Sequence, residues 1–142
     1  MLRKKAVIDS NEIIIGLTTE DTHSANFIIK LSEFKDKYEF IISDDIYQEV
    51  MRNISYSTKE KFSKLLGLKL ISIKNFFSDI GLFQKYKNLG FKKGDIAIAA
   101  FADKENADIL ISENRHFLKE LKTKKFKILN AEQFLKEIIK FK

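Results

Sequence analysis

Apolar and polar positions follow one another along this chain in blocks that predict strands and helices in turn. Short apolar runs ending in polar residues predict buried strands at residues 5–8, 39–43, 68–73, 108–112 and 126–129. Apolar residues at helical spacing predict helices at residues 11–17, 22–35, 45–54, 58–66, 75–89, 96–102 and 116–121, and a last helix after residue 130. This alternation predicts a three-layer α/β/α domain around a central, mainly parallel sheet.

Polar residues mark where these helices are expected to begin and end. The expected N-caps are Thr22, Asp44 or Asp45, Ser57 or Thr58, and Asn130. Gly90 is expected to end the helix before it. Because ligands of such sheets bind at the carboxyl ends of strands, we expect chemistry at Asp9 and at the polar turn 112–114.

The composition indicates one globular domain over residues 1–142. The chain has no proline, only five glycines and no linker-like stretch, and 44% of its residues are hydrophobic. The absence of cysteine excludes disulfides and thiolate metal sites and fits the cytoplasm. No apolar run is long enough for a signal peptide or a membrane span.

The net charge of +6 lies mostly near the C-terminus. Residues 113–142 hold nine Lys/Arg against four Asp/Glu, a net +5. Such a basic region either attracts a polyanion such as nucleic acid or is a solvated lysine surface, and charge alone does not choose between these.

Three acidic residues stand at informative places, and each has a local explanation. Asp9 can cap the helix that follows it, Glu49 can face solvent on its helix, and Asp95 has the position of an N-cap. The remaining acids near element ends are interpreted as caps or solvated side chains: Asp44, Asp45, Asp103, Glu105 and Asp108.

Four segments together resemble the successive motifs of the PIN domain family. They are VIDSN at residues 7–11, IYQEV at 46–50, GDIAIAA at 94–100 and ADILISENRHF at 107–117. The resemblance covers nearly the whole chain, and the size suits a stand-alone, VapC-like member. It implies a compact PIN-like fold in which Asp9, Glu49 and Asp95 bind Mg²⁺ or Mn²⁺ and catalyse hydrolysis of RNA phosphodiester bonds. Hard divalent cations prefer such oxygen ligands.

The resemblance also assigns roles to residues around these acids. Ser10 and Asn11 are expected to orient the first acid, to contact phosphate or to cap a helix. Asn114 stands where many members have Asp, so this catalytic position adds no charge and a second metal is in doubt. Cations flanking the third and fourth motifs are the expected phosphate contacts: Lys92, Lys93, Arg115 and Lys119. His116 is interpreted as an exposed or hydrogen-bonded turn residue, and His23 as structural.

The main functional hypothesis is an endoribonuclease that acts as the toxin of a toxin–antitoxin pair, with RNA as substrate, an antitoxin protein as partner and a homodimer as its assembly. A second hypothesis is a PIN fold that has lost catalysis and serves as an RNA-binding or assembly module, since Asn114 departs from the acidic pattern. A response-regulator-like domain is a third reading, and it lacks a suitable second acid pair.

Overall fold

A computed structural model describes residues 2–77, 79–120, 123 and 125–140. In these residues five parallel strands form one sheet in the order β3-β2-β1-β4-β5. The strands are β1 (Lys4–Ile8), β2 (Tyr38–Ser43), β3 (Ser72–Lys74), β4 (Ile109–Ile111) and β5 (Lys127–Leu129). The parallel sheet of the sequence prediction is therefore confirmed.

The strand order reverses beside β1, and this places two distant segments together. The chain runs from β1 outward to β2 and β3, then returns to β4 on the other side of β1. Val7 therefore pairs with Ile41 on one side and with Leu110 on the other. The polar residues that follow β1 and β4 meet at the carboxyl edge of the sheet, where parallel sheets bind ligands.

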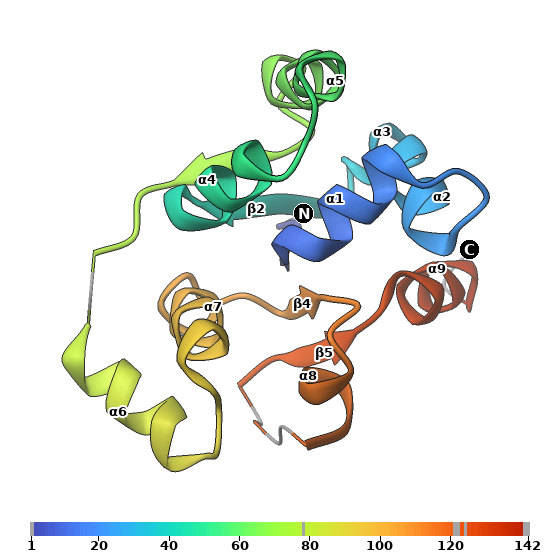
Figure 1. The fold of residues 1–142 in the computed structure, drawn as a ribbon. Helices are drawn as coiled ribbons and strands as arrows, with labels where there is room; N and C mark the ends of the chain where they lie inside the picture. The colour runs from blue at the N-terminus through green and yellow to red at the C-terminus, as the bar shows by residue number, and fades with distance from the viewer. Residues whose placement is uncertain (1, 78, 121–122, 124, 141–142) are drawn as a thin grey trace.

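Helices cover both faces of the sheet. Those between β1 and β3 are α1 (Ser10–Thr18), α2 (His23–Ile29), α3 (Leu31–Phe34), α4 (Asp44–Arg52) and α5 (Tyr56–Gly67). The later ones are α6 (Ile80–Asn88), α7 (Lys93–Lys104), α8 (Arg115–Glu120) and α9 (Ala131–Lys140). Figure 1 shows α1 to α5 on the side of β2, α7 and α8 near β4 and β5, and α6 beyond α7, against which it packs. Crossovers between parallel strands are right-handed. The connections after β3 run across the sheet in the opposite direction to the earlier ones, so α6 to α8 lie on the opposite face from α1 to α5.

Aromatic side chains fill much of the core between the layers. Phe134 of α9 packs edge-to-face on Phe27 and Tyr38, with ring centroids 5.3 and 5.0 Å apart. On the other face, Tyr86 contacts Phe91 at 5.1 Å in the same edge-to-face manner. These rings fix α9 against α2 and α6 against the segment that leads into α7, so the helices that carry polar residues to the sheet edge rest on a rigid core.

Several predicted N-caps are wrong by one to three residues. Ser43 caps α4 by accepting from the Ile46 N–H at 3.1 Å, and Ser55 caps α5. Both serines have extended backbones, so their hydroxyls reach back over the first turn. The residues expected there instead lie inside the helices: Asp44, Asp45, Ser57 and Thr58. The predicted caps Thr22 and Asn130 are confirmed by bonds of 3.0 and 2.8 Å.

The boundaries of other elements also differ from the prediction. The helix expected at 22–35 is divided into α2 and α3 at Lys30, and the strand expected at 68–73 is reduced to β3. The helix expected from 75 begins only at Ile80, after the cap Asp79. Gly90 follows its end with a φ of +97°, as a glycine in the left-handed region does. The predicted end of α8 at Leu121 lies outside the described residues.

Candidate metal centre at the carboxyl edge of the sheet

Asp9 lies directly after β1, where it both caps α1 and faces β4. Its Oδ1 accepts from the Ser10 N–H at 2.7 Å, which confirms the capping role. Its Oδ2 accepts from the Ser112 hydroxyl at 2.6 Å, and its own N–H donates to the Ile111 carbonyl at 2.9 Å. The residue is only 4% exposed. A carboxylate is thus held rigidly inside the sheet edge.

The electrostatic surroundings of Asp9 include two further carboxylates. Burial raises the pKa of Asp9 to about 6, against the lowering effect of the hydrogen bonds from Ser112 and Ser10. The charges of Glu49 and Asp95 raise this pKa further. Glu49 on α4 and Asp95 on α7 therefore both lie close enough to Asp9 for their charges to act on it. We call Asp9, Glu49 and Asp95 the candidate metal centre.

Asp95 lies in the first turn of α7 and is not its N-cap. Lys92 occupies the cap position and makes no side-chain capping bond, so the local interpretation of Asp95 as a cap is wrong. The helix begins earlier than its alanine-rich run predicted. This frees the Asp95 carboxylate, which accepts from Asn114 Nδ2 at 3.2 Å. Burial raises its pKa, while the charges of His116 and Lys92 lower it.

Asn114 connects the turn after β4 to α7. Its N–H donates to the Ser112 hydroxyl at 3.0 Å, its Oδ1 accepts from the His116 N–H at 3.0 Å, and its Nδ2 donates to Asp95. The amide can both accept and donate, which a carboxylate in this place could not do. Asn114 therefore holds Asp95 without adding a fourth negative charge beside Asp9.

The other predicted site residues lie around this centre. Glu49 is exposed on α4, Ser10 is buried, and Asn11 Oδ1 accepts from the Glu113 N–H at 3.4 Å. Arg115 is exposed at the start of α8. Lys92 and Lys93 are exposed where α7 begins, while the side chain of Lys119 lies outside the described part.

The donor set of the candidate metal centre fits a hard divalent cation in its chemistry. Its groups are carboxylate oxygens, and a bound cation would offset both the burial of Asp9, which is the main cause of its raised pKa, and the added repulsion from Glu49 and Asp95. Over the residues that the structure describes, however, no group of three or more His, Asp or Glu side chains is arranged so that it could hold a metal ion. Bringing all three acids onto one cation would require side-chain movement or bridging water.

The sequence predicted no individual role for two residues of this region, although one of them, Ser112, lies in the turn where chemistry was expected. Ser112 donates to Asp9 and accepts from Asn114, and its only signal was its place as a small polar residue ending a predicted strand. Glu12 of α1 is completely buried, although glutamate side chains are usually ionised and exposed to solvent. Neither role follows from local sequence, because each depends on a neighbour about 100 residues away in the chain.

Comparisons with known proteins support the fold. No protein-family model and no curated protein matches the chain. Among solved structures, the protein superposes with a TM-score of 0.64 on a chain of VapBC2 from Rickettsia felis. That crystal structure shows VapBC2 bound to a DNA fragment from its own promoter. The match has 19% sequence identity and covers 89% of this chain and 98% of the other. This match and the order of the five strands show that the chain has a PIN-like three-layer α/β/α fold.

In the described ranges no helix is long and apolar enough to cross a membrane.

Proposed function

We propose that the protein is a Mg²⁺- or Mn²⁺-dependent endoribonuclease and the toxin of a toxin–antitoxin pair. One observation carries this proposal: the buried Asp9, at the carboxyl end of the central strand, lies in the field of Glu49 and Asp95 from two other helices. A buried carboxylate at a sheet edge, whose pKa is raised by burial and by neighbouring acids on other elements, is typical of functional sites. The PIN-like fold supports the same conclusion.

The residues of the centre would have different roles in phosphodiester hydrolysis. A bound divalent cation would acidify the attacking water and stabilise the departing oxygen. Asp9, Glu49 and Asp95 would hold it, Ser112 orienting the first acid and Asn114 the third. Lys92, Lys93 and Arg115 are exposed cations on adjacent elements and would bind backbone phosphates.

The test is cleavage of structured RNA by the purified protein with Mg²⁺ or Mn²⁺. Asp9→Asn and Asp95→Asn should each remove cleavage while remaining folded. Glu60→Gln is the matched control, since Glu60 is an exposed helical acid on α5. Full activity in both Asn variants would refute the proposed centre.

A binding module without catalysis is the second candidate. It is favoured because, among the described side chains, no cluster of three or more His, Asp or Glu is already arranged to hold a metal ion. In that case RNA should bind and stay intact with either cation, and Asp9→Asn should leave its affinity unchanged. The cleavage assay, combined with a filter-binding measurement on the same RNA, separates the two candidates.

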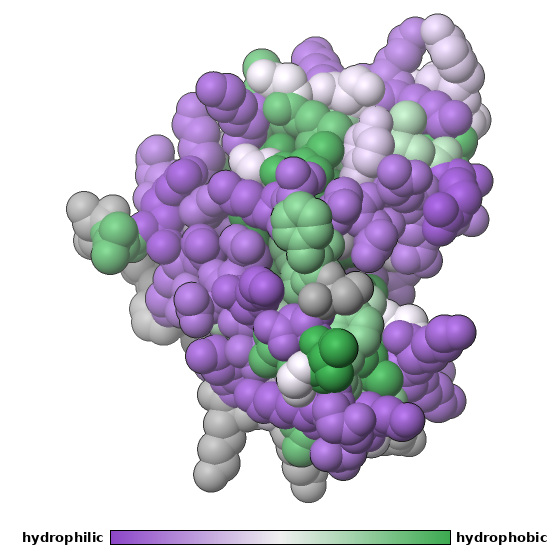
Figure 2. Space-filling view, turned by 90° about the vertical axis from the view of Figure 1, so that its left-hand side faces the viewer, coloured by the Kyte–Doolittle hydropathy of each residue, from purple (hydrophilic) through white to green (hydrophobic). Residues whose placement is uncertain are grey.

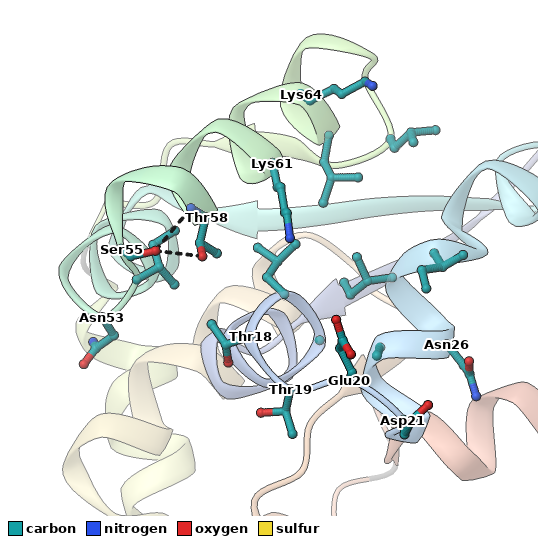
Figure 3. Close-up of a pocket in the computed structure, with 18 of the residues that line it drawn as sticks. Thr18, Thr19, Glu20, Asp21, Asn26, Asn53, Ser55, Thr58, Lys61 and Lys64 are labelled. Atoms are coloured by element: carbon teal, nitrogen blue, oxygen red, sulfur yellow. Dashed lines mark hydrogen bonds between the residues drawn. The ribbon is translucent and has the colours of Figure 1, made fainter.

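An antitoxin partner is supported by the likeness to a VapBC2 chain and by a groove of about 950 Å³ between α1, α2 and α5. Figure 3 shows Lys61 of α5 directed across this groove. Ile29 lines the groove and its side chain is 76% exposed. An apolar segment of a partner protein could therefore bind there and cover this side chain. The product of a small neighbouring gene should co-purify with the chain and block cleavage. Ile29→Asp should weaken that complex, whereas Tyr56→Asp, exposed outside the groove, should not.

A homodimer is proposed from a second apolar surface. Figure 2 shows apolar side chains exposed among polar ones on the face that includes α6. Phe77 and Ile80 are 77% and 87% exposed there, and Ile80 lies beside Phe83 and Ile96 around a hollow of about 270 Å³. Sedimentation should give a dimer for the wild type, a monomer for Ile80→Asp and a dimer for Tyr56→Asp.

A further inference from the structure

The fully buried Glu12 lies beside the half-buried Glu113, and the proposed chemistry uses neither acid. Glu12 belongs to α1 and is 0% exposed, while Glu113 lies in the turn between β4 and α8. The polar neighbours of the Glu12 carboxyl are Glu113 and Ser24, although neither of its oxygens makes a hydrogen bond of standard geometry. An acid buried in this way costs stability, so packing alone does not explain it.

The two carboxyl groups can attract one another only if one carries a proton. Burial, followed by the contact with Glu113, raises the pKa of Glu12 to about 9. Glu12 is therefore neutral near pH 7 and can donate its proton toward the Glu113 carboxylate. With Glu12 neutral, the two carboxyl groups do not repel one another as two charges would, and Glu12 has a proton that faces an acceptor.

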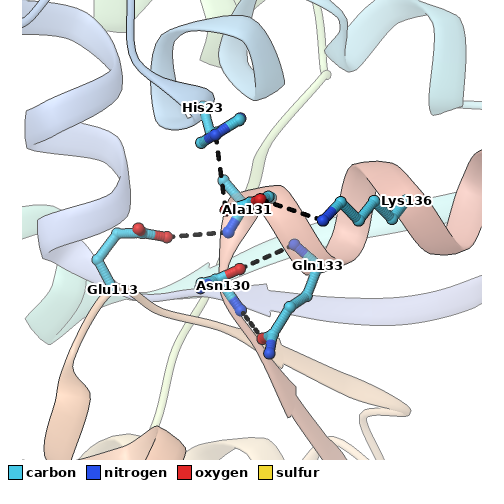
Figure 4. Close-up of polar contacts among 7 residues, drawn as sticks. His23, Glu113, Asn130, Ala131, Gln133 and Lys136 are labelled. Carbon is cyan, nitrogen blue, oxygen red and sulfur yellow. Dashed lines mark hydrogen bonds and ion pairs between the residues drawn. The ribbon is translucent and has the colours of Figure 1, made fainter.

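Glu113 also ties its turn to two helices. Its Oε2 accepts from the Ala131 N–H at 2.9 Å, at the free N-terminal end of α9, as Figure 4 shows. Its own N–H donates to Asn11 Oδ1 on α1. Helix N-termini leave unpaired N–H groups and favour negative charge, so the carboxylate is well placed there. One residue thus joins α1, the turn and α9.

The neighbours of Glu113 on both sides are the residues that hold the candidate metal centre. Ser112 donates to Asp9, and Asn114 donates to Asp95. A shift of this turn would move both donors at once. We propose that Glu12 and Glu113 are positioning residues: as a pair they fix the turn against α1 and α9, so that Ser112 and Asn114 orient the carboxylates of Asp9 and Asp95. The catalytic consequence rests on the proposed function.

The test compares isosteric and truncating variants of the pair. Glu12→Gln keeps a donor toward Glu113, and Glu113→Gln keeps an acceptor for Ala131. Glu12→Leu and Glu113→Ala remove these groups. Asp103→Asn is the control, because Asp103 is a buried acid that bonds Lys85 and Tyr86 and no residue of the centre.

The first measurement is amide hydrogen exchange at Asn114 and His116, whose N–H groups bond within the turn. Glu12→Leu and Glu113→Ala should raise exchange there about tenfold relative to the strands. The Gln variants should stay within about threefold of the wild type, and Asp103→Asn should not affect the turn selectively. Wild-type exchange in both truncating variants, or equal acceleration throughout the molecule, would overturn the proposal.

The second measurement is RNA cleavage by the same set. The truncating variants should lose about 10- to 100-fold in kcat with KM little changed, as removal of a supporting hydrogen bond does, and the Gln variants should recover most of it. A Gln variant as impaired as its truncated counterpart would contradict the positioning role. If the wild type cleaves no RNA, the proposed ribonuclease function fails, while hydrogen exchange still decides whether the pair positions the turn.

Discussion

Two buried aspartates in this molecule have opposite surroundings. Asp103, 8% exposed near the end of α7, accepts from Lys85 Nζ at 2.8 Å and from the Tyr86 hydroxyl at 2.7 Å. Burial alone would raise its pKa, but these bonds and the charge of Lys85 outweigh it, so the pKa is lowered. Asp9 is more deeply buried, yet its hydrogen bonds come from neutral groups and its charged neighbours are acids.

The difference between the two sites is that the fold supplies a positive partner for the charge of Asp103 and none for the charge of Asp9 among the described residues. The ion pair at Asp103 completes a structural contact between α6 and α7. Asp9 leaves its charge poorly compensated in the centre of the sheet edge. A buried charge without an opposite partner is costly, and proteins keep such groups where an external ligand or a reaction uses them.

The largest expected effect is that substitution of Asp9 reduces activity and not stability, whereas substitution of Asp103 reduces stability and not activity. Asp9→Asn should reduce RNA cleavage by about 100-fold or more while leaving the fold at least as stable. Asp103→Asn should retain cleavage and lower the free energy of unfolding by about 1–3 kcal/mol, because it weakens bonds to a charged partner. Urea denaturation and cleavage rates of both variants check this. Loss of stability in Asp9→Asn without loss of activity would reverse the comparison.

The pH dependence of stability should separate Asp9 from the rest of the chain. Its folded pKa of about 6 exceeds the ordinary 3.8, so ionised Asp9 destabilises the fold above pH 6 and this cost disappears as the pH falls toward 4. Without metal, Asp9→Asn should exceed the wild type by up to about 3 kcal/mol at pH 7.5 and match it near pH 4. Glu12 titrates in both proteins, and its contribution largely cancels because the charge of Asp9 is the smallest of the causes that raise its pKa. A gap that does not change with pH would contradict the buried, uncompensated charge.

Divalent cations should stabilise the wild type through the same residue. At about 100 times the dissociation constant, Mg²⁺ or Mn²⁺ should add about 2.7 kcal/mol to the free energy of unfolding. Asp9→Asn should lose most of this gain, and Asp103→Asn should keep it. Thermal melts at several cation concentrations are the measurement. Equal gains in all three proteins would place any metal outside the candidate metal centre.

Ser112→Ala should have the smallest effect. It removes the hydroxyl that donates to Asp9 and accepts from the Asn114 N–H, which should lower the free energy of unfolding by about 1 kcal/mol and cleavage by about tenfold. Ser112→Thr, which retains a hydroxyl, is the control. A rate for the Ala variant equal to that of the wild type would mean that Asp9 keeps its orientation without this bond.

The strand and helix order was predictable because hydrophobic periodicity is a local property. The runs at residues 5–8 and 39–43 became β1 and β2 with little change in their ends. The starts of α4 and α5 were less predictable, because Ser43 and Ser55 compete as caps with equally suitable residues nearby. The local interpretation of Asp95 as a cap was wrong because α7 begins at Lys93, before the alanine-rich run, so that Lys92 occupies the cap position.

By itself, the sequence determined the alternation of strands and helices, the carboxylates available for chemistry and the resemblance that joined Asp9, Glu49 and Asp95. Tertiary structure decided the rest: the pairing of β1 with β4, the Ser112 bond to Asp9 and the burial of Glu12 beside Glu113. The reason is physical. Periodicity and capping act over a few residues, whereas the charge state of an acid depends on burial and on neighbours that only the folded sheet brings together.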